Sequence, residues 1–375
     1  MNPWLDAVSQ VEALEDLQLD TNLVASMRER WQGLSGSQVG RMNFYTPSFR
    51  HHETSELSTT SCGKNAFPAI SITGGDCKLQ CDHCKAKILE PMIPVRSPEE
   101  LDRLVDQIVL DGGRGLLLSG GSDHQNVVHY EPYFPTVSKI KARYPNLQIA
   151  MHTGIATPEF ARGMEDAGVD VAMMDVIGAQ DTISQVYHLR RSVDDFEAAL
   201  EALVATKMKV VPHIVIGLHY GEMLGEWNSL EIVQRHLPSA LVLVVIMSQY
   251  ASQSRPFATP PSNEVGKYFM DARASLPDTP VLLGCARPSG VHRMETDSYA
   301  VMAGLNGIAF PSDGMLALAK HLDRDVFVTP SCCSMIVGEE VLALGEESGA
   351  IPLDHIPAAP KRRPALRDIP IVVTA

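Results

Sequence analysis

The chain has no long apolar run and comparatively few basic residues. Lys and Arg total 31 of the 375 residues against 45 Asp and Glu, which gives a formal charge of −14. A membrane-spanning helix needs about 18 consecutive apolar residues, so we expect no membrane partner. An acidic chain is poorly suited to bind a phosphate backbone, so we also expect no nucleic acid partner.

The first residues, MNPWLDAVSQVEALEDL, lack the basic and apolar segments of a secretory signal. We therefore expect a cytoplasmic protein, in which cysteines stay reduced rather than pair as disulfides. The chain has seven cysteines, an odd number, and three of them fall within eight residues. This distribution favours metal ligation over disulfide formation.

From Pro68 onward, short apolar runs alternate with longer amphipathic stretches, which is typical of a parallel sheet with helical crossovers. Eight such units favour an α/β fold, a (β/α)8 TIM-type barrel. A six-unit open barrel is the alternative, because the last two expected strands are short. The expected strands are 69–73, 115–119, 147–152, 170–175, 209–217, 241–248, 280–285 and 307–311.

We divide the chain into three parts. Residues 1–60 are expected to be a helical N-terminal extension, with helices near 3–17 and 22–32. Residues 61–325 are expected to form the barrel. Residues 326–375 are expected to be a C-terminal tail that carries Cys332 and Cys333.

Cys77, Cys81 and Cys84 follow the first expected strand with C-x3-C-x2-C spacing. Thiolates bind iron–sulfur clusters and zinc. Three of them can hold three irons of a [4Fe–4S] cube and leave the fourth iron open to a small chelating molecule. Zinc sites usually contain two pairs of ligands separated by a longer gap, so the spacing favours the cube. Zinc remains the alternative, with His83 as a possible ligand.

Four cysteines lie outside this group, namely Cys62, Cys285, Cys332 and Cys333. Barrel active sites lie at the C-terminal ends of the strands, where Cys285 is expected. The tail can bring the adjacent Cys332 and Cys333 over the same end, and Cys62 precedes the first strand. A buried cysteine is ordinarily a small hydrophobe, but four at such positions favour a second iron–sulfur cluster, most simply [4Fe–4S].

Two arginines, Arg287 and Arg293, follow Cys285 in the same expected loop. They can donate hydrogen bonds to cluster sulfides or hold an anionic group of a ligand. Ordinary salt bridges are the alternative. Asp175 ends the fourth expected strand, where a carboxylate can bind ligand hydroxyls or cap the next helix.

The segment ITGGDCKLQCDHCKAKIL resembles the signature of radical S-adenosylmethionine (radical SAM) enzymes. Within that superfamily, it resembles the biotin-synthase-like proteins and most of all the two-component lipoyl synthases. The stretches FYTPSFRHHET and GCARPSGVHRMETDSYAVMAGLNGIAFPS support the same group, and the resemblance covers residues 44–335. The chain lacks the extra N-terminal cysteine motif and the C-terminal RSSY of ordinary lipoyl synthases. It also lacks the cysteines that biotin synthase carries at the ends of strands two, three and five.

The resemblance implies roles for individual residues. The three clustered cysteines would hold the [4Fe–4S] cluster that binds SAM, with His83 against the nucleoside. The SGGSD segment resembles the GGE-type loop that binds the SAM amino group, although a plain turn is the alternative. Ser122 replaces the usual acid in that loop, and Asp123 can substitute for it. Asp175 would bind the ribose hydroxyls. Gly217 belongs to a stretch that resembles the family's GxIxGxxE element, although here the acid comes later, at Glu222. The SAM-binding residues implied are Gly120, Gly121, Ser122, Asp175, Gly217, Arg287 and Arg293.

The resemblance also implies an activity. It is sulfur insertion into a protein-bound octanoyl chain by a 5′-deoxyadenosyl radical, with the second cluster as sulfur donor. The implied partners are a sister radical SAM subunit, an octanoylated lipoyl carrier protein, and a ferredoxin or flavodoxin reductant. The alternatives are a radical SAM reaction on a small molecule, as in biotin synthase or a carbon-skeleton rearrangement, and a non-catalytic iron–sulfur protein.

Overall fold

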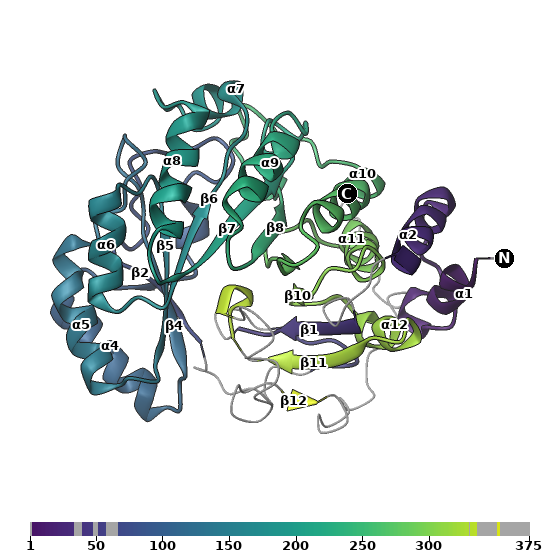
Figure 1. Cartoon of the computed structure of the whole chain (residues 1–375), viewed down its shortest axis with the longest axis horizontal. Coiled ribbons are helices and arrows are strands. Elements are labelled where there is room, and N and C mark those ends of the chain that lie inside the picture. Colours follow the sequence, from purple (N-terminus) through teal and green to yellow (C-terminus); the bar gives the residue numbers. More distant parts are fainter. Residues whose placement is uncertain are drawn as a thin grey trace, which may run out of the picture.

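The computed structural model describes residues 2–33, 40–47, 52–57, 67–329, 331–335 and 351–352. These residues form a strongly curled sheet with helices on its outer side (Figure 1). No helix in the described ranges is both long enough and apolar enough to cross a bilayer. Cys62 lies outside the described residues.

The sheet has twelve strands in the order β12-β11-β1-β10-β9-β8-β7-β6-β5-β4-β2-β3. All neighbouring strands are parallel except β11 and β12, which are antiparallel. The strands are β1 (Arg41–Tyr45), β2 (Ala69–Ser71), β3 (Ile93–Pro94), β4 (Gly115–Ser119), β5 (Gln148–Thr153), β6 (Val171–Asp175), β7 (Lys209–Ile216), β8 (Leu241–Val245), β9 (Val281–Leu283), β10 (Gly307–Ala309), β11 (Asp325–Thr329) and β12 (Ile351–Pro352).

The expected α/β fold of TIM type is confirmed, and each of the eight expected strands is present, as β2 and β4 to β10. The sheet is an open half-barrel, because β3 and β12 form its two edges among the described residues. The short β10 pairs with β9 on one side and with β1 on the other. It therefore has no free edge with which to close onto β2.

The N-terminal extension contains helices near both expected positions and also a strand that was not expected. Its helices are α1 (Pro3–Ser9) and α2 (Thr21–Gly33), separated by the single turn η1 (Glu12–Leu14). The strand β1 then enters the sheet between β10 and β11. Met42 and Phe44 are fully buried there. Burial of these two apolar side chains favours a place for the segment within the barrel rather than outside it.

The helices follow from amphipathic spacing and local caps. In α4 (Pro98–Leu110), Leu101, Val105 and Ile108 are buried on one face, and the Ser97 side chain accepts a hydrogen bond from the Glu100 amide. The remaining helices are α5 (Phe134–Arg143), α6 (Pro158–Ala167), α7 (Gln180–Gln185), α8 (Val193–Val204), α9 (Glu226–His236), α10 (Ser262–Ser275), α11 (Val291–Met302) and α12 (Met315–His321).

The inner face of the curled sheet is apolar. Side chains from neighbouring strands pack together there, among them Ala150, Met173, Val211 and Val242. The short helical turn η6 (Cys333–Met335) contacts β5, β6 and β10. The tail residues of η6 therefore lie against the inside of the half-barrel, whereas β11 and β12 extend the sheet at its edge.

Candidate functional site

The three clustered cysteines lie in the loop that joins β2 to the turn η3 (Lys87–Leu89), and all are free thiols. Cys81 is buried, and burial raises the pKa of its thiol. Burial would also raise the pKa of Cys84, but the neighbouring His83 lowers it below the ordinary value. A lowered pKa favours the thiolate, which is the form that ligates metals.

The same loop contains unusual backbone geometry. Gln80, Lys85 and Ala86 all have positive φ angles, of 48°, 46° and 62°. Such conformations cost energy for residues other than glycine and occur frequently at functional sites. The tight winding brings three thiols into one short loop at the C-terminal end of β2.

The glycine loop after β4 packs directly on the cysteine loop. A Cβ atom at Gly121 would lie 1.9 Å from the Asp76 carbonyl oxygen and 2.6 Å from the Cys77 Cα. The Ser122 carbonyl accepts hydrogen bonds from the Lys78 amide at 2.9 Å and the Cys77 thiol at 3.7 Å. Gly121 thus permits a close approach to the cysteine loop itself, a role that the sequence did not suggest.

Asp123, the possible substitute for the missing acid of the glycine loop, forms its hydrogen bonds within its own turn. Its carboxylate accepts hydrogen bonds from the Gln125 and Val127 amides, at 2.8 and 3.0 Å, and interacts with the His129 ring at 3.1 Å. The carboxylate therefore closes its own turn.

His83 is positioned by its neighbours on two sides. Its ring centroid lies 5.0 Å from that of Tyr187, and the ring hydrogen-bonds with Cys84. Burial opposes a charged ring, but the charges of Cys84 and Asp175 raise the pKa of His83 above its ordinary value. Its Nδ1 atom is buried without a hydrogen-bond partner in the described structure. An unsatisfied buried donor or acceptor beside the cysteines is available to a bound molecule.

Asp175 stands at the C-terminal end of β6 and caps no helix, because α7 begins at Gln180 with Ala179 as its N-cap. Burial opposes its charge, but His152 and further histidines lower its pKa to about 2. His152 Nε2 lies 3.7 Å from the carboxylate, and the rings of His152 and His213 lie 5.5 Å apart. The helix-capping alternative is wrong, and a charged carboxylate remains at the barrel mouth.

After β7, the acid that accepts hydrogen bonds from the backbone of the Gly217 loop is Glu226 and not Glu222. Gly217 has a φ angle of +78°, and its amide donates a 2.7 Å hydrogen bond to Glu226 Oε1. The other oxygen accepts from the Gly225 amide at 2.9 Å. Glu226 is 4% exposed, whereas Glu222 is solvent-exposed. An acid nine residues after Gly217 at a helix start is a signal that the sequence reading missed.

Three of the four remaining cysteines come together. Cys333 is buried among inner-face residues, with Cys285 and Cys332 packed against the same cluster. A hydrogen bond with Cys333 lowers the pKa of Cys332 to about 7, and His152 contributes to the same shift. That hydrogen bond raises the pKa of Cys333, with smaller contributions from burial and Cys285. The tail therefore packs its two cysteines against the same inner-face cluster that Cys285 contacts, and their role as cluster ligands stays a prediction.

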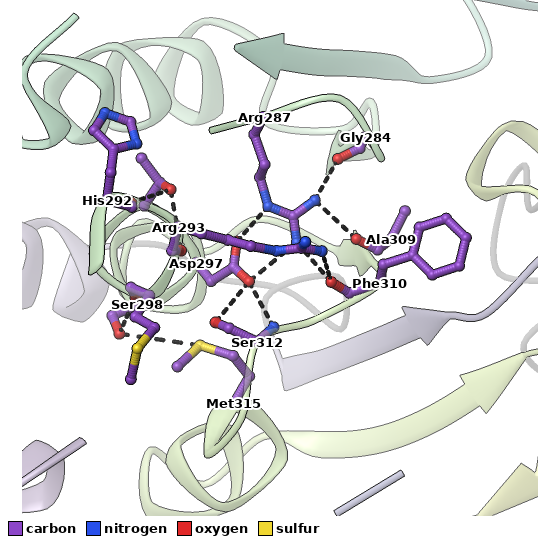
Figure 2. A network of polar contacts seen from close by, with 12 residues as sticks. Gly284, Arg287, His292, Arg293, Asp297, Ser298, Ala309, Phe310, Ser312 and Met315 are labelled. Carbon is purple, nitrogen blue, oxygen red and sulfur yellow. Dashed lines mark hydrogen bonds and ion pairs between the residues drawn. The ribbon is translucent and has the colours of Figure 1, made fainter. Parts of the chain in front are cut away.

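Arg287 has a structural role, contrary to its expected contact with a cofactor. Its five N–H groups are all used within the protein (Figure 2). Two form a bidentate pair with Asp297 at 2.6 and 3.0 Å, and three reach the carbonyls of Gly284, Ala309 and Phe310. Arg293 also donates to the Phe310 carbonyl. The contacts of Arg287 therefore form a buried ion-pair network within the protein, whereas the expected cofactor contact of Arg293 stays a prediction.

The chemistry of the donor set fits an iron–sulfur cluster better than a single ion. Among the described residues, no three His, Cys, Asp or Glu side chains are arranged to hold one metal ion, so the zinc alternative receives no support. Three thiols in one loop, one of them with a lowered pKa, are suitable ligands for a cluster. The unsatisfied Nδ1 of His83 lies beside them.

Residues 71–230 match the family model of the radical SAM superfamily. The match runs from β2 into α9 and includes the three clustered cysteines, the glycine loop, Asp175 and Gly217. This part of the chain, 160 of the 375 residues, is therefore similar to the radical SAM superfamily, whose enzymes use a [4Fe–4S] cluster and SAM.

Two solved structures share the fold. One is HydG, a maturase of the [FeFe]-hydrogenase, with a TM-score of 0.58 and 12% identity over 92% of this chain and 80% of that one. The other is HydG from Carboxydothermus hydrogenoformans, with a TM-score of 0.52 and 14% identity over 76% of this chain and 62% of that one. Identities this low establish the common fold alone. No curated protein sequence matches the chain.

Proposed function

We propose that the chain is a radical SAM sulfur-insertion enzyme, one half of a two-component lipoyl synthase. The observation that supports this proposal is the second cysteine group. Cys285 at the end of β9 and Cys332 and Cys333 in the tail pack in one cluster on the inner face of the half-barrel. Three thiols at that position suit an auxiliary iron–sulfur cluster.

Both cysteine groups lie close enough to the Asp175–His152 pair to be affected by its charges. The charge of Asp175 affects the pKa values of Cys81 and Cys84, and the charge of His152 affects the pKa of Cys332. A substrate held near Asp175 would therefore lie near both cysteine groups. Proximity of this kind is what a reaction between groups from two sites requires.

Each of the site residues would have a separate role. Cys77, Cys81 and Cys84 would hold the SAM-binding cluster, His83 would contact the nucleoside, and Asp175 would accept hydrogen bonds from ribose hydroxyls. The apolar inner face would accommodate an alkyl chain and exclude water. When bound, the cluster and SAM would supply the radical that breaks a C–H bond, and the auxiliary cluster would supply the sulfide for the new C–S bond.

The proposed substrate is an octanoyl chain attached to a lysine of a lipoyl carrier protein. The proposed sister radical SAM subunit would form the second C–S bond, and a ferredoxin or flavodoxin would supply electrons. This assignment is supported by the resemblance of the cysteine loop to two-component lipoyl synthases together with the second cysteine group.

Iron and sulfide counting on anaerobically reconstituted protein tests the two-cluster arrangement. We expect about eight irons per chain, falling to about four when Cys77, Cys81 and Cys84 are replaced by Ala. Replacement of Cys285, Cys332 and Cys333 should also leave about four irons, while SAM cleavage persists. About four irons in the unaltered protein, all lost with the first group, would remove the sulfur donor and contradict the proposal.

The product tests the reaction itself. Octanoylated carrier protein incubated with the enzyme, SAM and reductant should gain the mass of sulfur, as measured by mass spectrometry of the modified lysine peptide. The variant without the second cysteine group should cleave SAM but leave the octanoyl group without sulfur. Sulfur insertion by that variant would refute the assigned donor.

A further inference from the structure

Asp82 lies between the second and third cysteines of the loop and is almost completely buried, with 7% of its surface exposed. Its backbone is held by two different loops. The Asp82 amide donates to the Val186 carbonyl, and the Asp82 carbonyl accepts from the Ser252 amide, both at 2.9 Å. Val186 follows α7, and Ser252 follows the turn η5 (Ser248–Tyr250) after β8.

The carboxylate of Asp82 has three side-chain donors. Oδ1 lies 2.7 Å from Lys85 Nζ and 3.1 Å from His188 Nε2. Oδ2 accepts a hydrogen bond from the Tyr220 hydroxyl at 3.0 Å. The loops after β6 and β7, which carry His188 and Tyr220, thus meet the cysteine loop at one carboxylate. Hydrogen bonds to a charged acceptor with little solvent exposure are stronger than those between neutral groups.

A second set of contacts stabilises these partners. The Tyr220 hydroxyl also lies 2.9 Å from the Gln185 carbonyl oxygen. The Arg255 guanidinium lies 3.8 Å from the centroid of the Tyr220 ring and donates to the Gln185 side chain at 3.1 Å. His188 and Tyr220 have positive φ angles of 58° and 54°. Two residues other than glycine that contact Asp82 therefore have costly backbone conformations, as is frequent at functional sites.

We propose that Asp82 is a positioning residue for the cluster ligands Cys81 and Cys84, and that its charge lowers the reduction potential of the cluster they hold. The inference rests on the proposed cluster ligation by Cys77, Cys81 and Cys84 and is independent of sulfur insertion. Cluster potentials depend on nearby charge and hydrogen bonding. A carboxylate next to the ligand Cys81 and two residues before the ligand Cys84 disfavours the added electron, so removal of its charge makes reduction easier.

The test compares Asp82→Asn and Tyr220→Phe with the unaltered full-length protein after anaerobic reconstitution. Asp82→Asn keeps the size of the side chain and removes its charge. We expect its SAM-responsive cluster, followed by electron paramagnetic resonance during a redox titration, to have a less negative midpoint potential. Tyr220→Phe keeps the charge and should leave the potential in place. Both should lower kcat for SAM cleavage by roughly tenfold, as replacement of residues that orient metal ligands typically does.

Asp170 offers a matched control, because it directly precedes β6 and so lies at the other end of this strand from Asp175. Its carboxylate also binds a lysine, with Lys141 Nζ at 2.9 Å, and accepts from the Ile149 amide at 2.7 Å. Asp170→Asn should lower the melting temperature without changing the potential or the SAM-cleavage rate of folded protein.

The outcomes separate the two proposals. An Asp82→Asn protein that loses thermal stability as Asp170→Asn does, but keeps the unaltered potential and cleavage rate, would overturn the role of Asp82 and leave cluster ligation standing. An unaltered protein that shows no SAM-responsive cluster would overturn both.

Discussion

The Tyr187 hydroxyl donates a hydrogen bond to Asp175 Oδ2 across 3.4 Å. The Tyr187 ring lies 5.0 Å from that of His83, which adjoins Cys84, while His152 faces the other carboxylate oxygen at 3.7 Å. Aromatic and charged groups therefore extend from the first cysteine group towards the second through a single carboxylate. Under the proposed function, we therefore expect replacement of Asp175 to affect SAM binding.

Replacement of Asp175 by Asn should weaken SAM binding. The carboxylate is charged at neutral pH because its pKa is about 2, and as an acceptor for ribose hydroxyls it would form charge-assisted hydrogen bonds. We expect KM for SAM to rise about tenfold, the usual cost of one such bond. Tyr187→Phe, which removes only the donor to Asp175, should have a smaller effect. Equal KM values for all three proteins, measured by 5′-deoxyadenosine formation, would refute this role of Asp175.

Replacement of Gly121 by Ala should displace the cysteine loop. The added Cβ would lie 1.9 Å from the Asp76 carbonyl oxygen, and neither backbone can yield without moving Cys77. We expect loss of cluster incorporation, measured as iron per chain and as absorbance of the reconstituted protein. Gly75→Ala, in the cysteine loop, is the control, because nothing lies within 4 Å of a Cβ at that position. Normal iron content in the Gly121→Ala protein would contradict the proposed fit of the two loops.

The strands and the first cysteine group could be predicted because their signals are local. A buried parallel strand needs an apolar run, as in LVLVV of β8, and the three cysteine ligands lie within eight residues. The second group was harder to predict, because Cys285 and Cys332 are distant in sequence. Placing them together required the assumption that the tail folds back onto the strand ends.

What the sequence could not reveal depends on partners that are distant along the chain. The sequence analysis did not predict β1, because its place between β10 and β11 depends on pairing with residues more than 250 positions away. Arg287 next to a predicted site suggested ligand binding, yet Asp297 and three carbonyls satisfy its guanidinium. A side chain's role follows from its partners, which local patterns do not specify.

Breaking the Arg287–Asp297 pair should strongly destabilise the protein. Both side chains are fully buried, so Arg287→Ala leaves the Asp297 charge without its partner. We expect the free energy of unfolding in urea to fall by about 3–5 kcal/mol. Arg143→Ala removes a half-exposed arginine paired with Asp102 and should cost at most about 1 kcal/mol. Similar losses in the two variants would show that the buried network contributes no more than a surface pair.

A double-mutant cycle checks that the effect belongs to the pair. Asp297→Ala also removes the acceptor of the Ser312 amide and hydroxyl, so it should destabilise the protein in its own right. The double variant should lose less stability than the sum of the single variants, because neither charge then remains unpaired. If the stability losses of the two single variants simply add up in the double variant, Arg287 and Asp297 are not coupled.

Protonation of His213 should make the protein less stable in acid. Burial and the nearby His152 charge lower the pKa of His213 to about 4, although Asp175 opposes the shift, whereas the unfolded chain has a pKa of about 6.5. As pH falls below 6.5, the unfolded state takes up a proton that the folded state binds only near pH 4. Stability is therefore lost progressively across that interval.

Urea unfolding of the unaltered protein and of His213→Asn, compared between pH 7 and pH 4, measures this contribution. Asn cannot titrate, so the free energy of unfolding of the variant should fall less steeply over this range. His321→Asn, at an exposed position in α12, controls for the loss of a histidine as such. Parallel pH profiles for the unaltered protein and His213→Asn would mean that His213 takes up its proton equally readily in the folded and unfolded chain.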